Sequence, residues 1–452
     1  MNIVIGGCGK IGGNIIETLI KEGNDVTCID SDHKVIEEMT NIYDVMGVCG
    51  SASDTDTLSE ANIQKAELFV AVTGSDELNM LSCFIAKKMG AKHTIARIRN
   101  PEYNDSSLEF MRNQLGLSKS INPDFLVARE LYNLLKLPSA LKVELFSRGN
   151  LEMIEFQLKE GSKLHDVKLC DIKSKFKTNA LVGIVKRENE VYIPNGDFAL
   201  KEGDHIVITT SPAKIEKLLK DLGTFKKKTK NVMILGGSRT AYYLAKRLCR
   251  IGISPKIIEK DPARCQELCE ELPKATIIYG DGTEKELLLE EGLLDMDAFV
   301  ALTGTDEENI LLSIFAKNHN VPTIIPKVNR AEFVDMAKSL GLDCIVSPKE
   351  CTTAVMLRYA RAIKNSMGSN VETLYKLMDG KVEALEFNVK ADFEAINIPL
   401  KDLKLKKSIL LAGIVRGKKV IIPGGEDVIL PEDKVLILSM ENDLNDLKDI
   451  LL

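Results

Sequence analysis

The chain has 452 residues, which is too long for one ordinary hydrophobic core and predicts two to four domains. Hydrophobic residues make up 44% and charged residues 28%, as in a normal globular protein, and the formal net charge is −6. The sequence contains no strongly basic block, so general nucleic-acid binding is not expected. It also contains no apolar run that approaches the roughly 18 residues of a membrane span.

Metal and disulfide sites are not expected from the ten cysteines, which include no C-x-x-C pair. Cys265 and Cys269 stand one helical turn apart, but no third or fourth ligand is near them, so reduced thiols are favoured over a metal site. The five histidines are scattered, and none is paired with a plausible nucleophile. A predicted strand begins directly after Met1, so no signal peptide is expected.

The first thirty residues follow the order strand, glycine turn, helix, strand and acid. Gly7, Gly9 and Gly12 form a G-x-G-x-x-G motif after an apolar strand and at the start of a helix. Such glycines allow a tight turn, close backbone approach to a pyrophosphate, and close packing of helix on strand. Backbone N–H groups at the helix N-terminus would face the phosphates. Asp30 ends the second strand and would bind ribose hydroxyls. It would repel a 2′-phosphate, so NAD or an adenosine nucleotide is favoured over NADP.

The chain repeats itself with a period of about 230 residues. Val70–Asn79 returns as Val300–Asn309, and Gly7 returns as Gly236. Each half is therefore expected to contain a nucleotide-binding fold followed by a smaller module.

Strand and helix alternate from Met1 to about Leu117, which predicts a doubly wound parallel sheet. Its strands are expected near residues 2–5, 25–29, 45–48, 68–72, 93–98 and 119–121. An amphipathic helix is expected from Pro123 to Leu137, with a counterpart from about Lys349 to Ile363. The sequence leaves open whether these helices belong to the core or dock on a partner subunit.

After Leu141 the pattern changes to short strands and turns, which predicts a small α+β module. A helix over 212–222 is expected to be the last element of this module. Residues 225–230 form a basic stretch that is expected to be a solvated linker. The predicted architecture is two tandem Rossmann-like domains, each followed by a small α+β domain, with bounds at 1–140, 141–224, 231–365 and 366–452.

Other candidate ligand residues end or follow the strands of the first half, where ligands bind in this fold. Thr73 and Gly74 end the fourth strand, and Gly50 and Ser51 follow the third and could border the adenine. Arg97 and Arg99 alternate at the end of the fifth strand, so both could face a phosphate. The acids Asp76 and Glu77 are interpreted instead as charges that favour a helix start.

The second glycine loop is altered, because Ser238 stands where the second glycine should be and its Cβ would hold off a pyrophosphate. Lys327 and Asn329 replace the two arginines. The second site is therefore expected to bind more weakly. Its candidate residues are Gly236, Gly237, Ser238, Arg239, Thr240, Glu259, Asp281, Thr303 and Gly304.

With these motifs, the whole chain resembles the TrkA family, the cytosolic subunit of Trk/Ktr-type potassium uptake systems. The matching motifs are the loop Gly7–Gly12, Asp30, Val70–Thr73, Asp76-Glu77-x-Asn79 and Ala96–Tyr103. The resemblance implies tandem RCK nucleotide and C-terminal domains. It also implies that NAD(H), or alternatively ATP or ADP, contacts Gly7, Cys8, Gly9, Lys10, Ile11, Asp30, Thr73, Gly74 and Arg97. It further implies self-association into dimers or a tetrameric ring on a membrane potassium pore, with the chain in the cytoplasm, peripheral on the inner face of the membrane.

A regulatory function is favoured over an enzymatic one. A dehydrogenase needs a general acid or base beside the nicotinamide. No credible catalytic set can be named, since the small modules contribute only His165 and His205, both from the first copy. Two alternatives stay open: a free-standing nucleotide sensor, and an NAD-dependent oxidoreductase, which the fold alone would allow.

Overall fold

The computed structural model describes residues 1–101, 103, 105–159, 161–176, 180–222, 228–366, 371–378, 380–406, 408–441, 444 and 446–452. Of the predicted basic linker, residues 225–227 lie outside this part of the chain.

The first half begins with a six-stranded parallel sheet in the order β3-β2-β1-β4-β5-β6. Apolar runs such as β4 are buried along their whole length, as expected of parallel strands that helices cover on both faces. The strands are β1 (Asn2–Gly6), β2 (Asp25–Asp30), β3 (Met46–Cys49), β4 (Leu68–Ala71), β5 (His93–Arg97) and β6 (Lys119–Ile121). The helices are α1 (Lys10–Lys21), α2 (His33–Ile42), α3 (Thr55–Glu60), α4 (Asp76–Met89) and α5 (Asp105–Leu115). The predicted doubly wound sheet is confirmed.

The second half repeats this sheet in the order β14-β13-β12-β15-β16. An isolated parallel bridge between Lys327 and Val346 stands where the first half has β6. The strands are β12 (Asn231–Leu235), β13 (Ser254–Glu259), β14 (Thr276–Tyr279), β15 (Ala298–Ala301) and β16 (Thr323–Pro326). The helices are α9 (Arg239–Arg250), α10 (Pro262–Glu271), α11 (Lys285–Glu290), α12 (Asp306–Asn318) and α13 (Ala331–Ser339).

Each half also contains a small antiparallel sheet, in the orders β10-β9-β11-β8-β7 and β17-β18-β21-β19-β20. The first comprises β7 (Lys142–Phe146), β8 (Leu151–Gln157), β9 (Leu181–Arg187), β10 (Glu190–Tyr192) and β11 (His205–Thr210), with α7 (Leu169–Phe176) and α8 (Ile215–Asp221). The second comprises β17 (Val371–Leu377), β18 (Val382–Asn388), β19 (Ile409–Arg416), β20 (Lys419–Ile421) and β21 (Lys434–Ser439).

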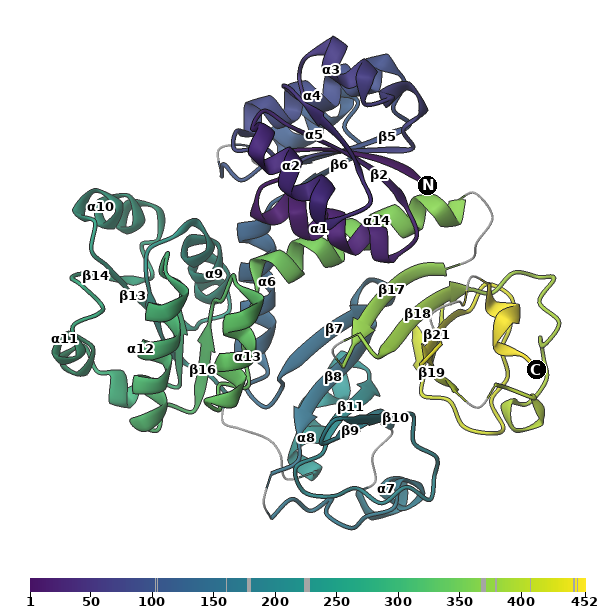
Figure 1. Cartoon of the computed structure of the whole chain (residues 1–452). Coiled ribbons are helices and arrows are strands. Elements are labelled where there is room, and N and C mark those ends of the chain that lie inside the picture. Colours follow the sequence, from purple (N-terminus) through teal and green to yellow (C-terminus); the bar gives the residue numbers. More distant parts are fainter. Residues whose placement is uncertain are drawn as a thin grey trace.

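The two small sheets lie side by side (Figure 1), and their buried apolar side chains form one hydrophobic core. A Cβ on Gly183 would lie 2.4 Å from Cδ1 of Leu438, and one on Gly413 would lie 2.6 Å from Cδ2 of Leu151. Both distances are far below a van der Waals contact. The repeated glycines therefore allow the sheets to approach each other closely.

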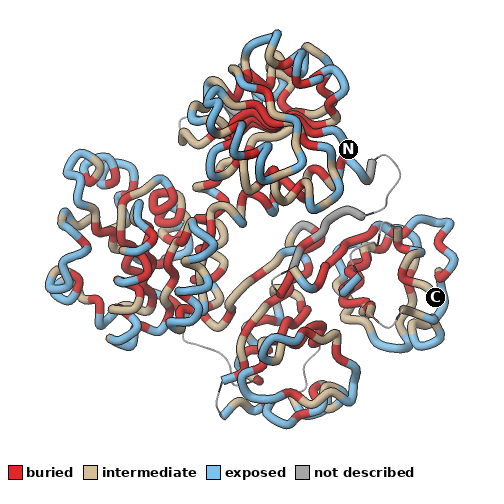
Figure 2. Tube along the Cα trace, viewed as in Figure 1, coloured by how far each residue is buried: buried red, intermediate tan, exposed pale blue. Residues whose placement is uncertain are grey.

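Two long helices are exchanged between the halves. Helix α6 (Pro123–Lys136) packs on α9, and α14 (Pro348–Ser366) packs on α1. Leu131 of α6 is buried in the core of the second half, and Met356 of α14 in that of the first. Figure 2 shows the buried residues along both exchanged helices and the central strands. Both helices are thus core elements, each of the opposite half, and the halves interlock within one chain.

Candidate functional site

The three glycines of the first loop have different structural roles. Gly7 has a φ of +95°, and a Cβ there would lie 2.8 Å from the Thr73 nitrogen. A Cβ on Gly12 would lie 2.0 Å from the Gly7 carbonyl oxygen. Gly9, in contrast, has a φ of −64°, and a Cβ there would meet no atom within 4 Å. The fold therefore requires Gly7 and Gly12, whereas the absence of a side chain at Gly9 only keeps the space above the loop open.

Gly9 is also the N-cap of α1, and no side chain caps this helix. The N–H groups of the first turn thus remain as donors for a ligand, next to the positive end of the helix dipole.

A cavity of about 620 Å³ lies at the carboxyl ends of the strands of the first sheet. All but one of the predicted first-half contacts line this cavity, and the exception is Cys8. The lining contacts are Gly7, Gly9, Lys10, Ile11, Asp30, Gly50, Ser51, Thr73, Gly74 and Arg97. The Cys8 thiol is buried and donates to the Ile29 carbonyl at 3.5 Å. Ligand contact by Cys8 would therefore be through its backbone.

The Asp30 carboxylate is fixed at the end of β2 by two backbone donors. Its Oδ2 accepts from the Cys8 N–H at 2.7 Å, and its Oδ1 accepts from the Asp32 N–H at 3.1 Å. These hydrogen bonds tie the acid to the glycine loop, and Asp30 lines the cavity.

Arg97 is the main buried cation of this site, with only 9% of its surface exposed. It donates through Nη2 to the Thr73 carbonyl, while its Nε has no hydrogen-bond partner in the described part of the chain. Burial lowers the pKa of Arg97, and the neighbouring Arg99 lowers it further. A buried donor without a partner beside a cavity fits an anionic ligand, because leaving it unpaired is costly.

Asn79 fixes the loop between Thr73 and Arg97. Its Oδ1 accepts from both the backbone and the hydroxyl of Thr73 at 2.8 Å, and its Nδ2 donates to the Arg97 carbonyl at 3.0 Å. Asp76, in the first turn of α4 as predicted, accepts from the Arg99 and Asn100 N–H groups at 2.8 Å. It therefore also anchors the segment that follows β5.

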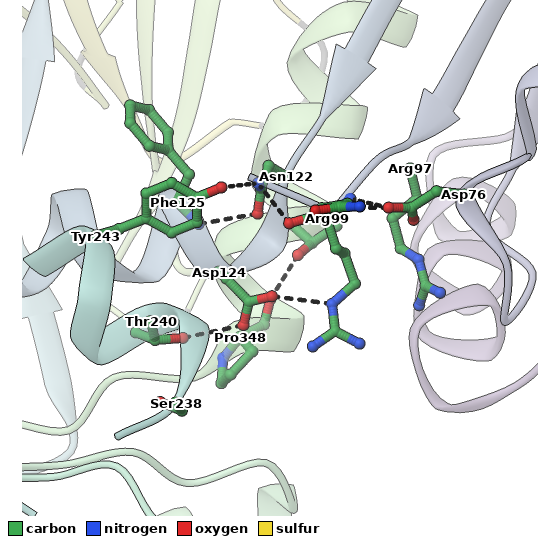
Figure 3. Close-up of polar contacts among 12 residues, drawn as sticks. Asp76, Arg97, Arg99, Asn122, Asp124, Phe125, Ser238, Thr240, Tyr243 and Pro348 are labelled. Atoms are coloured by element: carbon green, nitrogen blue, oxygen red, sulfur yellow. Dashed lines mark hydrogen bonds and ion pairs between the residues drawn. The ribbon is translucent and has the colours of Figure 1, made fainter. Parts of the chain in front are cut away.

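Asp124, at the start of α6, joins the two halves beside the cavity (Figure 3). Its Oδ2 accepts from Nε of Arg99 at 2.9 Å, and its Oδ1 accepts from the Thr240 hydroxyl at 3.0 Å. Nearby, Nδ2 of Asn122 donates to the Tyr243 hydroxyl at 3.1 Å. The predicted second-loop residue Thr240 thus lines the first cavity.

Residues of the second half complete this cavity: Thr240, Lys327, Asn329, Pro348 and Lys349. The comparison of the two halves assigned Lys327 and Asn329 to the second site alone, but in the structure they line the same cavity as Arg97 and Arg99. Burial lowers the pKa of Lys327. Sequence reasoning missed the contributions of Asp124, Pro348 and Lys349. Asp124 directly follows β6 of the first sheet, whereas Pro348 and Lys349 come from the second half and reach this sheet because α14 packs on α1.

The polar groups of the second loop are largely paired with one another. The Ser238 hydroxyl accepts from the Ala241 N–H at 3.4 Å and caps α9. Glu259 accepts from the N–H groups of Gly237 and Asp261. Arg264, which sequence reasoning missed, donates through Nε to the Gly237 carbonyl at 2.8 Å.

The remaining second-half candidates lie around this loop or beyond it. Gly236 adopts a φ of +91°, and a Cβ on Gly304 would meet no atom within 4 Å. Asp281 accepts from the Thr283 N–H, and the Thr303 N–H donates to Asn309, both at 2.9 Å. Arg239 is not among the described residues that line the first cavity.

The described residues provide neither a metal site nor a membrane span. They contain no group of three or more His, Cys, Asp and Glu placed to hold a metal ion. None of the helices in this part of the chain is both long and apolar enough to cross a bilayer.

Two family models match this chain, each twice. The TrkA-N domain model matches residues 3–123 and 232–348, and the TrkA-C domain model matches residues 153–223 and 384–452. The chain is 34% identical over 453 residues to Trk system potassium uptake protein TrkA homolog 1 of Methanosarcina mazei, a match that covers 97% of each protein.

Solved structures of the GsuK channel share the fold. The NAD-bound channel aligns with a TM-score of 0.63 at 16% identity, covering 97% of this chain and 76% of that one. The ADP-bound protein aligns with a TM-score of 0.51 at 14% identity, covering 81% and 69%. The tandem matches to both family models and the full-length relative show that this chain belongs to the TrkA family.

Proposed function

We propose that this chain is the nucleotide-binding regulatory subunit of a Trk-type potassium uptake system. The observation that carries the proposal is the first cavity, which combines an open glycine loop, the Asp30 carboxylate and a buried arginine with an unpaired donor. Family membership supports the potassium system, because the full-length relative is named as a potassium uptake protein.

NAD(H) is the proposed ligand, with ATP or ADP as the alternative. The diphosphate would lie against Gly9 and the N-terminus of α1, with Arg97 and Lys10 as its cations, and Asp30 would accept from the ribose hydroxyls. The GsuK structures bound to NAD and to ADP support a nucleotide in this fold.

Regulation would follow from the shared lining of the cavity. A phosphate between Arg97 and Lys327 would contact both halves at once, so it would bind more tightly when these residues are close. If the ligand binds one arrangement of the two halves about 2 kcal/mol more tightly than the other, it would shift the ratio of the two arrangements roughly thirtyfold. The exchanged helices α6 and α14 would carry that shift, because each begins at the cavity and packs on the opposite half.

The proposal gives the cavity no catalytic role. Its carboxylates are already engaged, Asp30 by two backbone donors and Asp124 by Arg99 and Thr240. Lys327 is assigned to phosphate binding, since an anionic ligand would offset the positive charges that Lys327 and Arg97 bring to the lining of one cavity.

Self-association into dimers or a tetrameric ring is also part of the proposal. Leu81 of α4 is 50% exposed and Leu311 at the equivalent position of α12 is 66% exposed. Phe110 and its equivalent Leu340 are 65% and 47% exposed. Large apolar side chains exposed at the same positions of both repeats indicate a surface that another copy covers.

The test is potassium flux through the reconstituted membrane transporter, with and without this subunit, in NADH, NAD, ATP and ADP. We expect the subunit to bind the transporter from the cytoplasmic side and at least one nucleotide to change the flux. A Gly9→Val chain should bind the transporter but lose the nucleotide response. If no nucleotide changes the flux and the subunit does not bind, a free-standing nucleotide sensor becomes the better assignment.

A further inference from the structure

A second cavity, of about 970 Å³, lies between the exchanged helices and the small sheets. Residues of both halves line it, from β6, α6, α9, α14 and the edge of the small sheets. Seven of its lining residues are basic: Lys119, Arg129, Lys246, Arg247, Arg250, Arg358 and Lys434. Glu386 is the one acidic residue among the described residues that line it.

Glu386 can offset only one of these seven charges. Its two carboxylate oxygens accept from the backbone N–H and the hydroxyl of Ser147, both at 2.9 Å, and Lys434 lies 3.7 Å away. Six basic side chains therefore remain without a carboxylate on the cavity wall.

Aromatic rings and hydroxyl groups, rather than acids, hold several of these cations. Arg358 lies 4.5 Å from the centre of the Tyr375 ring and donates to its hydroxyl. Arg247 lies over Phe125 and Tyr132 at 5.1 and 5.4 Å, and its Nη1 is buried without a hydrogen-bond partner in the described structure. These contacts orient the guanidinium groups but leave their charge in place.

The remaining cations are close enough to repel one another. Lys119, Arg129 and Arg250 form no ion pair with a carboxylate of the described residues. Burial lowers the pKa of Lys119, and Arg358 and Arg129 lower it further. Burial also lowers the pKa of Arg247, which Arg129 and Arg250 lower further.

One acid outside the lining, Glu130, feels the charge of this cluster but offsets it only in part. Burial and the neighbouring carboxylate of Glu144 raise the pKa of Glu130 to about 7, although Lys142, Arg129 and Arg358 act in the opposite direction. Its carboxyl group is therefore largely protonated at slightly acidic pH. The cluster is left with an excess of positive charge, which an anionic ligand would relieve.

We propose that this cationic cavity binds a small anion that carries several phosphate groups. Cations from both halves surround the space, so a ligand with spread negative charge would contact more of them than a single phosphate could. The rings of Tyr243 and Tyr359 on the wall would also accept a nucleobase. Inorganic polyphosphate and a nucleoside polyphosphate thus share this chemistry. The inference does not depend on what occupies the first cavity.

The test is calorimetric titration of the full-length chain with sodium tripolyphosphate and, in parallel, with ATP. The triple variant Lys119→Gln, Arg129→Gln, Arg250→Gln removes three cavity charges. The matched control Lys65→Gln, Lys217→Gln, Lys274→Gln removes three exposed charges elsewhere. Wild type and control should bind tripolyphosphate alike, and the triple variant at least tenfold more weakly, because charge-assisted hydrogen bonds are lost. Thermal unfolding checks that each variant folds. If the triple variant does not fold, Arg250→Gln, whose side chain is exposed, should still weaken binding measurably.

A Gly9→Val chain separates the two cavities, because it should keep tripolyphosphate binding. If that chain binds ATP more tightly than tripolyphosphate, the ligand class is a nucleotide. If it binds both equally, the cavity recognises only the phosphate groups. The inference is overturned if wild type shows no saturable binding, if the triple variant binds as tightly as wild type, or if Gly9→Val abolishes binding. An acidic peptide that binds where tripolyphosphate does not would assign the cavity to a protein partner instead.

Discussion

The substitution Gly9→Ser should separate the stability of the first loop from its ability to bind a nucleotide. The new Cβ would meet no atom within 4 Å, and the backbone at φ −64° and ψ −166° suits any residue. The serine would stand at the uncapped N-terminus of α1, just as Ser238 caps α9. A serine N-cap stabilises a helix by a few tenths of a kcal/mol relative to glycine, so the melting temperature should stay constant or rise slightly.

Nucleotide binding should weaken in the same variant. The side chain would occupy the space above the loop, and its hydroxyl would accept from an N–H group that otherwise serves the diphosphate. The loss of one hydrogen bond to a charged group costs about 1.5–3 kcal/mol, which corresponds to roughly a ten- to hundred-and-fiftyfold weaker affinity. Titration calorimetry with NADH and ADP measures the affinity, and thermal unfolding without nucleotide measures the stability.

Ser238→Gly is the matched control in the second loop. It should lower the stability by a few tenths of a kcal/mol and leave binding in the first cavity unchanged. A folded Gly9→Ser chain with wild-type affinity would refute the reasoning, since the phosphates could not then approach this loop. Gly12→Ala offers a contrast, because its Cβ would lie 2.0 Å from the Gly7 carbonyl and should disrupt the fold itself.

Three further predictions concern the cavity and the helix exchange. Asp30→Ala should weaken nucleotide binding by about 1–3 kcal/mol, because the ribose hydroxyls lose a charged acceptor, and unchanged calorimetric affinity in a folded variant would remove Asp30 from the site. Lys327→Met should weaken nucleotide binding in the first cavity by at least a few fold, although this residue belongs to the second half. Wild-type affinity in the variant would show that the ligand does not contact the part of the lining that the second half contributes. Burial raises the pKa of Glu130 to about 7, so the folded chain binds more protons than the unfolded chain between about pH 4.5 and 7, and stability should fall as the pH rises through this window. Glu130→Gln should flatten that part of the stability curve in chemical denaturation, and an equally steep curve in the variant would assign the dependence to another group.

The sequence was informative about the fold because its signals are local. The apolar runs that end at Gly6 and Asp30 and the glycine spacing between them specify strand, turn and helix without reference to distant residues. The internal repeat then extended this prediction to the second half, where the second sheet is confirmed. The domain bounds at 140, 230 and 366 stay a prediction.

The composition of the cavity could not be predicted in the same way, because it depends on tertiary contacts. Thr240 and Lys327 carry no signal that would separate them from ligands of the second loop. They reach the first cavity only because α6 and α14 exchange between the halves, and amphipathic spacing alone does not say which half such a helix covers. Arg264 was missed for a related reason, since a helix-surface arginine gives no sign that its guanidinium turns back to the Gly237 carbonyl.

The most direct test of this account is the position of a bound nucleotide in a crystal structure of the full-length chain with NADH or ADP. The account predicts density in the first cavity, with the diphosphate against Gly9 and Arg97 and the ribose on Asp30. Density at the Gly236–Ala241 loop, with none in the first cavity, would contradict it.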